Sequence, residues 1–107
     1  MGKKKTIIMP NTEKVLEQLG KQIKFARLRR GISSELLAER AFVSRATIWK
    51  IENGSSSISI GSYASVLHAL GNLDRDLLLV AKDDDLIKTM QDLNLNIRKR
   101  AKKRVDN

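Results

Sequence analysis

The chain has 107 residues, of which 41% are hydrophobic and only 4% aromatic, and its formal net charge is +9. This length allows one domain with modest extensions, and the absence of cysteine excludes disulfides, thiolate catalysis and cysteine-ligated zinc. Because no apolar run approaches the roughly 20 residues that cross a membrane, and no secretory signal follows the N-terminal lysines, we expect a soluble, cytoplasmic, nucleoid-associated protein without a membrane contact.

The first predicted helix covers residues 13–30 and follows a short extended arm, residues 6–9. Pro10 closes the arm, and Asn11 or Thr12 offers the N-cap. Basic residues crowd the last turn, where the helix dipole is negative, and a glycine then ends the helix. Apolar residues recur along it at a helical period. They are Leu16, Leu19, Ile23, Phe25 and Ala26.

Two short helices follow, and only two residues separate the first from the serine that caps the second. Ser33 or Ser34 caps residues 35–41, and Ser44 caps residues 45–53. Two short helices joined by so tight a turn are typical of a helix-turn-helix.

Three further helices are predicted downstream. They cover about residues 61–70, about residues 73–80, and a last stretch that begins at the three aspartates 83–85 and ends near Leu93. Beyond the arm at 6–9 the pattern predicts no strand. Short helices with short connections indicate a compact all-α domain.

The positive charge is concentrated at the two ends of the chain. Residues 1–11 carry +3 and residues 95–107 carry +5, which leaves only +1 on residues 12–94. Basic tails attract polyanions, either nucleic acid or an anionic membrane surface; the alternative is that they merely solubilise disordered ends. We expect a basic arm at 1–11, a helix-turn-helix domain at 12–81 and a C-terminal extension at 82–107 with a short helix and a basic tail.

Small and apolar residues occupy a characteristic set of positions in the two short helices. Ala38 is small where two helices must cross, Ile48 and Ile51 point inward with Leu37, and Asn53-Gly54 offers positive backbone angles that end a helix. With these residues, about 16–80 resemble the Cro/CI-type (XRE) helix-turn-helix family. The resemblance implies a five-helix, lambda repressor-like domain that binds double-stranded operator DNA as a homodimer. The matching segments are 19–20, 27–33, 37–41 and 43–54.

One residue departs from that family pattern. The family usually places glycine in the turn at the position of Phe42. A bulky residue at positive φ is costly. Either the turn has a different geometry here, or Phe42 fills an apolar gap that repays the strain.

The second short helix offers the predicted recognition surface. Arg45 can present a two-donor fork to guanine, Ala46 a methyl contact to thymine, and Lys50 can reach a guanine or a phosphate. Trp49 is too large for such a pairing and contacts a sugar, a thymine methyl or a protein. The alternative is a merely solvated helix face. The predicted DNA-binding residues are Ser34, Ser44, Arg45, Ala46, Thr47, Trp49, Lys50, Asn53 and Ser55.

The resemblance also implies supporting roles for residues around this helix. It places Ser34, Asn53 and the backbone after Gly54 against phosphates, where they fix the register on DNA. It pairs Arg27 with Glu52 as a structural ion pair between the first and third helices; the alternative is two separate surface charges. A partly buried pair would orient the recognition helix more than it stabilises the fold.

The residue set for metal binding or catalysis is incomplete. His68 is the only histidine and has no carboxylate at ligand spacing on its helix. The three aspartates at 83–85 lack the alternating pattern of a calcium loop. No glycine-rich phosphate loop and no nucleophile–base set is present. We therefore expect no metal, no cofactor and no enzymatic activity.

The C-terminal third carries a second, looser pattern. An apolar run at 77–81, the aspartates 83–85, the segment 90–95 and a basic tail follow one another. With this order, residues 77–104 resemble HipB-type antitoxins, which pair with HipA-type kinase toxins and repress their own operon. The resemblance implies a HipA-like kinase toxin as a partner.

Two alternatives to an antitoxin stay open: a stand-alone repressor, phage-like or metabolic, and a protein-interaction adaptor that kept the fold but lost DNA binding. The charged, capped recognition helix argues against the adaptor. We expect the homodimer seam at exposed apolar residues of the fourth and fifth helices, among them Leu73, Leu77 and Leu78.

Overall fold

The computed structural model describes residues 7–94, and every regular element in that range is a helix. The predicted all-α fold class is confirmed. Residues 7–9 form no strand, and residue 6 of the expected arm lies outside the described range. No helix in 7–94 is long and apolar enough to span a bilayer. The elements are α1 (Pro10–Arg29), α2 (Ser34–Ala41), α3 (Arg45–Glu52), α4 (Ile60–Gly71), the 3-10 helix η1 (Leu73–Leu79) and α5 (Lys82–Asn94).

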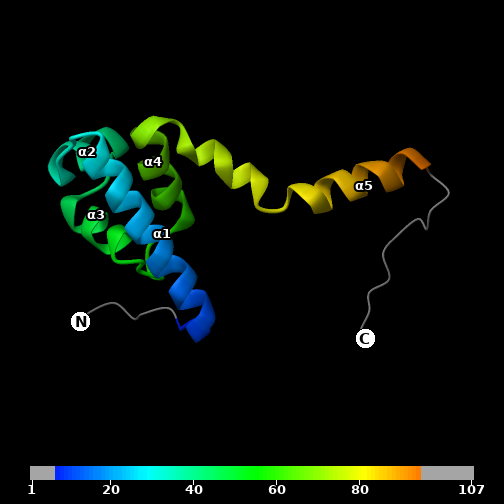
Figure 1. Cartoon of the computed structure of the whole chain (residues 1–107), viewed down its shortest axis with the longest axis horizontal. Coiled ribbons are helices and arrows are strands. Elements are labelled where there is room, and N and C mark those ends of the chain that lie inside the picture. The colour runs from blue at the N-terminus through cyan, green and yellow to red at the C-terminus, as the bar shows by residue number, and fades with distance from the viewer. Residues whose placement is uncertain (1–6, 95–107) are drawn as a thin grey trace. The chain divides into compact units, whose positions relative to one another are not determined.

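The chain divides into two compact units, Met1–Leu77 and Leu78–Asn107. The first unit contains α1 to α4 and the beginning of η1, and the second contains α5. Within the first unit, α1 to α4 gather into one bundle (Figure 1). In that bundle α2 packs against α3 and α4, and α1 packs against α3.

The core of the first unit is built almost entirely from aliphatic side chains. The inward positions predicted from sequence spacing, Leu37, Ile48 and Ile51, are fully buried, and Ala38 is buried where small size was expected. Removing such side chains from water provides the main drive for folding. The largest fully buried residues are Ile23, Leu37, Ile48, Ile51 and Val66.

Serine hydroxyls begin three of the helices. The Oγ of Ser33 accepts a hydrogen bond from the amide of Leu36 at 3.0 Å, so Ser33 rather than Ser34 caps α2. Ser44 caps α3 in the same way, as predicted, and Ser59 caps α4. Each hydroxyl satisfies one of the amides that a helix start leaves without a partner.

Two predictions about α1 were wrong. The helix begins at Pro10, with Met9 at the N-cap and no side-chain cap, so neither Asn11 nor Thr12 caps it. Proline suits the first helical position because its φ is preset and it has no amide to satisfy. Phe25 is 64% exposed rather than part of the core, because it lies two residues after buried Ile23 and thus about 200° around the helix.

Both explanations for Phe42 were also wrong. The residue has φ 57° and ψ 42°, which is the left-handed conformation that glycine normally adopts in this turn. Its side chain is 94% exposed, so it fills no apolar gap. The turn therefore keeps its usual geometry and carries the strain of a bulky residue at positive φ, without packing that repays it.

The residues expected at a dimer seam differ from one another in exposure. Leu73 and Leu77 are half-buried and pack against the core, contrary to the expectation that they are exposed, whereas Leu78 is exposed. Within the first unit, an open apolar hollow of about 210 Å³ remains beside them. Its lining residues include Leu19, Ala26, Leu67, Leu73 and Leu77.

Candidate nucleic-acid interface

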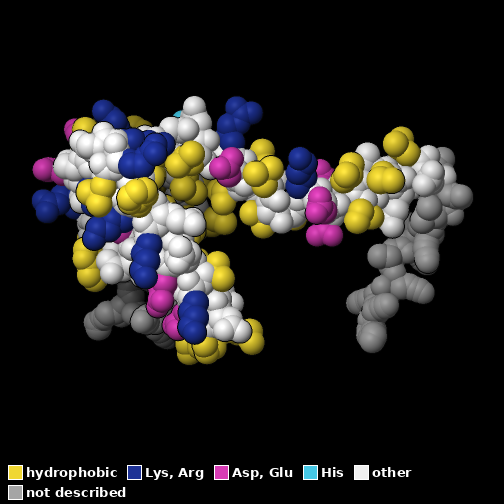
Figure 2. All heavy atoms as spheres, viewed as in Figure 1, with side chains coloured by type: hydrophobic (Ala, Val, Ile, Leu, Met, Phe, Trp, Pro, Cys, Tyr) yellow, Lys and Arg dark blue, Asp and Glu magenta, His cyan; other side chains and the backbone are white. Residues whose placement is uncertain are grey.

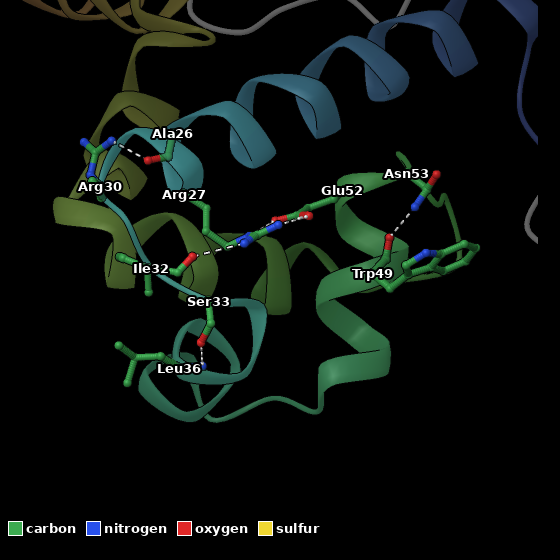
Figure 3. Close-up of polar contacts among 9 residues, drawn as sticks. All are labelled: Ala26, Arg27, Arg30, Ile32, Ser33, Leu36, Trp49, Glu52 and Asn53. Carbon is green, nitrogen blue, oxygen red and sulfur yellow. Dashed lines mark hydrogen bonds and ion pairs between the residues drawn. The ribbon is translucent and has the colours of Figure 1, made fainter.

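A two-donor ion pair holds the C-terminal end of α3 against α1 (Figure 3). The Nε of Arg27 donates to Glu52 Oε2 at 2.7 Å, and its Nη2 donates to Oε1 at 3.1 Å. Its remaining Nη1 donates to the carbonyl of Ile32 at 3.0 Å. Hydrogen bonding to Glu52 raises the pKa of the Arg27 guanidinium above its ordinary value. The predicted pair is confirmed, and both side chains are about nine-tenths buried.

Two glycines bring the backbones of α1 and α3 into direct contact at the same end. A Cβ on Gly20 would lie 2.7 Å from the carbonyl oxygens of Ile51 and Glu52. A Cβ on Gly54, which has φ +72°, would lie 2.7 Å from the backbone of Glu17. No larger residue fits either position without a backbone shift. Gly54 alone supplies the positive φ expected of the Asn53-Gly54 pair, since Asn53 has φ −99°.

The loop after α3 is fixed to α4 by the only tyrosine. The Tyr63 hydroxyl donates to the carbonyl oxygen of Ser55 at 2.7 Å, and the amide of Ser55 donates to the carbonyl of Lys50 at 2.9 Å. Tyr63 is only 7% exposed, and burial raises the pKa of its phenol. The loop therefore has little freedom to move relative to the helices.

The opposite side of α3 faces solvent. Arg45 and Ala46 are exposed in its first turn, Trp49 is 66% exposed, and Lys50 is half-buried. Within residues 7–94 the Arg45 guanidinium has no hydrogen bond or ion pair, so all its donors remain open. These four side chains, predicted as the recognition surface, share one accessible face.

The other predicted DNA-binding residues are partly engaged within the chain. Ser44 Oγ accepts from the amide of Thr47 and donates to Thr47 Oγ1, both at 3.0 Å. The Asn53 side-chain amide donates to the carbonyl of Trp49 at 2.8 Å (Figure 3), and Ser55 Oγ lies 2.8 Å from Ser57 Oγ. Ser34, in the first turn of α2, is half-buried. These bonds hold the polar rim of the surface in place.

An open hollow of about 420 Å³ lies between the start of α1 and the end of α3. Trp49, Lys50 and Asn53 line one side, and Glu13 and Glu17 line the other. These two carboxylates were not predicted to lie beside the proposed recognition surface. The available signal was Gly20 in the middle of a helix, because a glycine there weakens the helix and usually has a packing reason.

A family model described as a helix-turn-helix domain matches residues 18–79, more than half of the chain. The chain belongs to the helix-turn-helix domain family. That family indicates DNA binding and regulation of transcription, and the Cro/CI-type (XRE-like) resemblance is confirmed at this level. None of the curated proteins compared with the chain matches it.

The helix-turn-helix match ends short of two features of this chain. Glu13 and Glu17, on the acidic side of the hollow, precede the matched residues. The helix α5 follows the matched residues. The match therefore covers the later part of α1, all of α2 to α4, and η1.

The histidine lies beside one carboxylate on the surface of the helix-turn-helix domain. His68 Nδ1 is 3.1 Å from Asp74 Oδ1, and the His68 side chain is well exposed. No group of three metal-ligating side chains occurs among residues 7–94. This contact joins α4 to η1 and does not complete a set of metal ligands.

Proposed function

We propose that this helix-turn-helix protein is a sequence-specific transcriptional repressor that inserts α3 into the major groove of operator DNA. The observation that supports this most directly is the free guanidinium of Arg45 on a helix whose far end is fixed by Arg27 and Glu52. A side chain that discriminates between bases needs open donors and a fixed direction. Arg45 has both.

Each residue on the accessible face of α3 has a matching chemistry in the groove. Arg45 donates two hydrogen bonds to guanine O6 and N7, and the methyl of Ala46 contacts a thymine methyl. Lys50 binds a phosphate or a guanine, and the indole of Trp49 packs on sugar or a thymine methyl.

Polar residues around α3 position the protein on the sugar–phosphate backbone. Ser34, at the start of α2, and Asn53 and Ser55, at the end of α3, contribute phosphate contacts that carry no direct sequence information. Ser44 acts chiefly by capping the recognition helix, because its hydroxyl accepts a hydrogen bond from the amide of Thr47, and it also donates to the Thr47 hydroxyl.

The active form is a homodimer, since one such domain covers only a half-site and a two-fold operator requires a two-fold protein. We place its seam at the apolar hollow that Leu73 and Leu77 line in the first unit.

The test compares operator and random-sequence DNA for Arg45→Ala. We expect specific binding to weaken by about 1–3 kcal/mol per half-site and preference to relax at one base pair. Arg75→Ala, an exposed arginine in η1, is the matched control. Equal losses on both DNAs would make Arg45 a phosphate contact and remove the proposed base readout.

At a finer level, we propose that the repressor is a HipB-like antitoxin that controls its own operon and binds a HipA-like kinase. The support is the order of segments in 77–104, an apolar run, acidic cap and basic tail. A stand-alone repressor is the alternative. If the reading frame beside this gene encodes no kinase-like protein, and co-expression with such kinases yields no complex, the antitoxin role is wrong.

A further inference from the structure

The hollow between α1 and α3 has walls of opposite charge. Lys50 lies on the α3 wall, and Glu13 and Glu17 lie on the α1 wall. Both glutamates are exposed, and Figure 2 shows acidic side chains at the surface along the first half of α1. One positive and two negative side chains give the lining of the hollow a net charge of −1. This negative charge lies beside the surface that is proposed to contact DNA.

Other groups of the described chain do not pair with these three charges. Among residues 7–94, the side chains of Glu13, Glu17 and Lys50 make no hydrogen bond and no ion pair. A space of about 420 Å³ is on the order of 10 Å across, close to the Debye length of about 8 Å at physiological salt. Salt therefore screens the charges on the two walls only in part, and each of them acts on a charge that enters the hollow.

DNA that contacts the α3 wall of the hollow passes close to the α1 wall. Lys50, Asn53 and Ser55, three residues of the proposed interface, line the same hollow as the two glutamates. A backbone phosphate that approaches Lys50 also approaches two carboxylates, and like charges repel. A guanine edge offers Lys50 the uncharged acceptors O6 and N7, so the carboxylates disfavour it much less. Phosphate contacts by the uncharged Asn53 and Ser55 meet the same repulsion, so they position the protein and add little affinity.

We propose that Glu13 and Glu17 are specificity-determining residues, which disfavour phosphate at Lys50 and leave its ammonium to bind a guanine. This inference rests on the proposed function and decides between the two contacts given there for Lys50. On random-sequence DNA, where the matching guanine is mostly absent, phosphate is the main partner within reach of a lysine, and the carboxylates oppose it. On operator DNA the guanine is present. The two carboxylates thus widen the difference between operator and random-sequence affinity.

The test replaces both carboxylates with amides of the same shape, Glu13→Gln with Glu17→Gln, in the full-length protein. The parent protein first selects an operator duplex from a pool of randomised DNA. Fluorescence anisotropy at several salt concentrations then measures affinity for this duplex and for a random-sequence duplex. The double variant should bind random-sequence DNA about three- to tenfold more tightly, and the operator about twofold more tightly or less. On random-sequence DNA the slope of log affinity against log salt should steepen by about 0.9, as expected for one additional neutralised phosphate.

Two controls separate an effect at Lys50 from an effect of net charge. In a Lys50→Met background the two glutamine substitutions should no longer change the ratio of operator to random-sequence affinity, because the ammonium that they redirect is absent. Asp83→Asn with Asp84→Asn removes the same charge from exposed residues of α5 that do not line the hollow. This second pair should leave the ratio within about twofold of the parent.

Each result decides the inference. A fall in the ratio of operator to random-sequence affinity that requires Lys50 supports it. An equal rise in affinity on both DNAs, or an equal fall in the ratio for the α5 control, overturns it, because the carboxylates would then act only through net charge. If the parent selects an operator and the glutamine substitutions leave both affinities unchanged, this inference alone is wrong. If the parent selects no sequence from the pool, the proposed function is wrong and this inference with it.

Discussion

The two ends of α3 are held by different means. The C-terminal end is joined to α1 by the Arg27–Glu52 pair and by backbone contact at Gly20, and its loop is bonded to Tyr63. The N-terminal end is held by a single serine cap and follows a strained residue, Phe42, that packs on nothing. A helix anchored at its far end can present its first turn to solvent without losing its direction.

This difference separates the residues that hold the fold from those that we propose to contact DNA, along one short helix. Ile48 and Ile51 face the core, and the anchors lie beside them at the C-terminal half. Arg45 and Ala46 lie at the other end, where substitution removes no core contact. We therefore expect changes at the C-terminal end to alter folding strongly, and changes at the N-terminal end to alter it little.

The largest effect is expected for Glu52→Ala. It leaves the Arg27 guanidinium buried without its carboxylate and should lower the free energy of unfolding by about 3–5 kcal/mol, measured by urea denaturation. The double variant Arg27→Met with Glu52→Leu should recover most of that loss, because no charge is then buried. A loss in Glu52→Ala no larger than the roughly 0–1 kcal/mol of an exposed ion pair would show that the pair is not the anchor.

Gly20→Ala should cost about 3 kcal/mol, because the added methyl meets two backbone carbonyls that cannot move independently. Gly61→Ala is the matched control. A Cβ there meets only Ser59 Oγ, at 3.7 Å, so alanine should be neutral or slightly stabilising. Thermal unfolding of the two variants measures the difference. Similar losses in both would contradict a specific contact at Gly20.

Tyr63 makes the anchored end sensitive to alkaline pH. Its folded pKa is raised above the ordinary 10.0 by burial, so the folded state holds the proton more tightly than the unfolded state. The contribution of Tyr63 to stability is therefore fully present below the ordinary phenol pKa. It is lost as the pH rises through the pKa of Tyr63 in the folded state. Tyr63→Phe should cost about 1 kcal/mol at neutral pH and flatten the alkaline decline. If stability falls as steeply with rising pH in Tyr63→Phe as in the parent protein, groups other than Tyr63 cause the fall.

The smallest effect is expected at the N-terminal end and has the opposite sign. Phe42→Gly relieves the positive φ and should raise the free energy of unfolding by about 0.5–1 kcal/mol, after allowing for the freer unfolded chain. Phe42→Ala retains a Cβ at the same φ and should gain little. If chemical denaturation gives the alanine and glycine variants the same free energy of unfolding, backbone strain at Phe42 does not lower stability.

Local patterns predicted most of the fold. Serine caps, glycine stops and inward isoleucines are short-range features, and they located the helices within a few residues and identified the helix-turn-helix. The start of α1 was misplaced because the polar Asn11 and Thr12 looked like caps, although Pro10 needs none. Phe42 was misjudged because exposure depends on neighbours that are distant in sequence.

The candidate site was likewise predicted in part and missed in part. The exposed face of α3 followed from helical spacing, and the Arg27–Glu52 pair followed from a family resemblance. Glu13 and Glu17 were missed beside Trp49, because only the crossing of α1 and α3 brings them there. Contacts created by a crossing depend on three-dimensional packing and leave only an indirect trace in the sequence, such as Gly20.

The arrangement of aromatic residues has a practical consequence for spectroscopy. The single tryptophan lies exposed on the proposed recognition surface, and the single tyrosine is buried in the core. Indole emission responds to what surrounds the ring, so it should change when a ligand covers α3 and change much less when the core unfolds. The phenol of Tyr63 has the opposite sensitivity. One chromophore thus reports occupancy of the surface and the other reports integrity of the fold, in the same unlabelled sample.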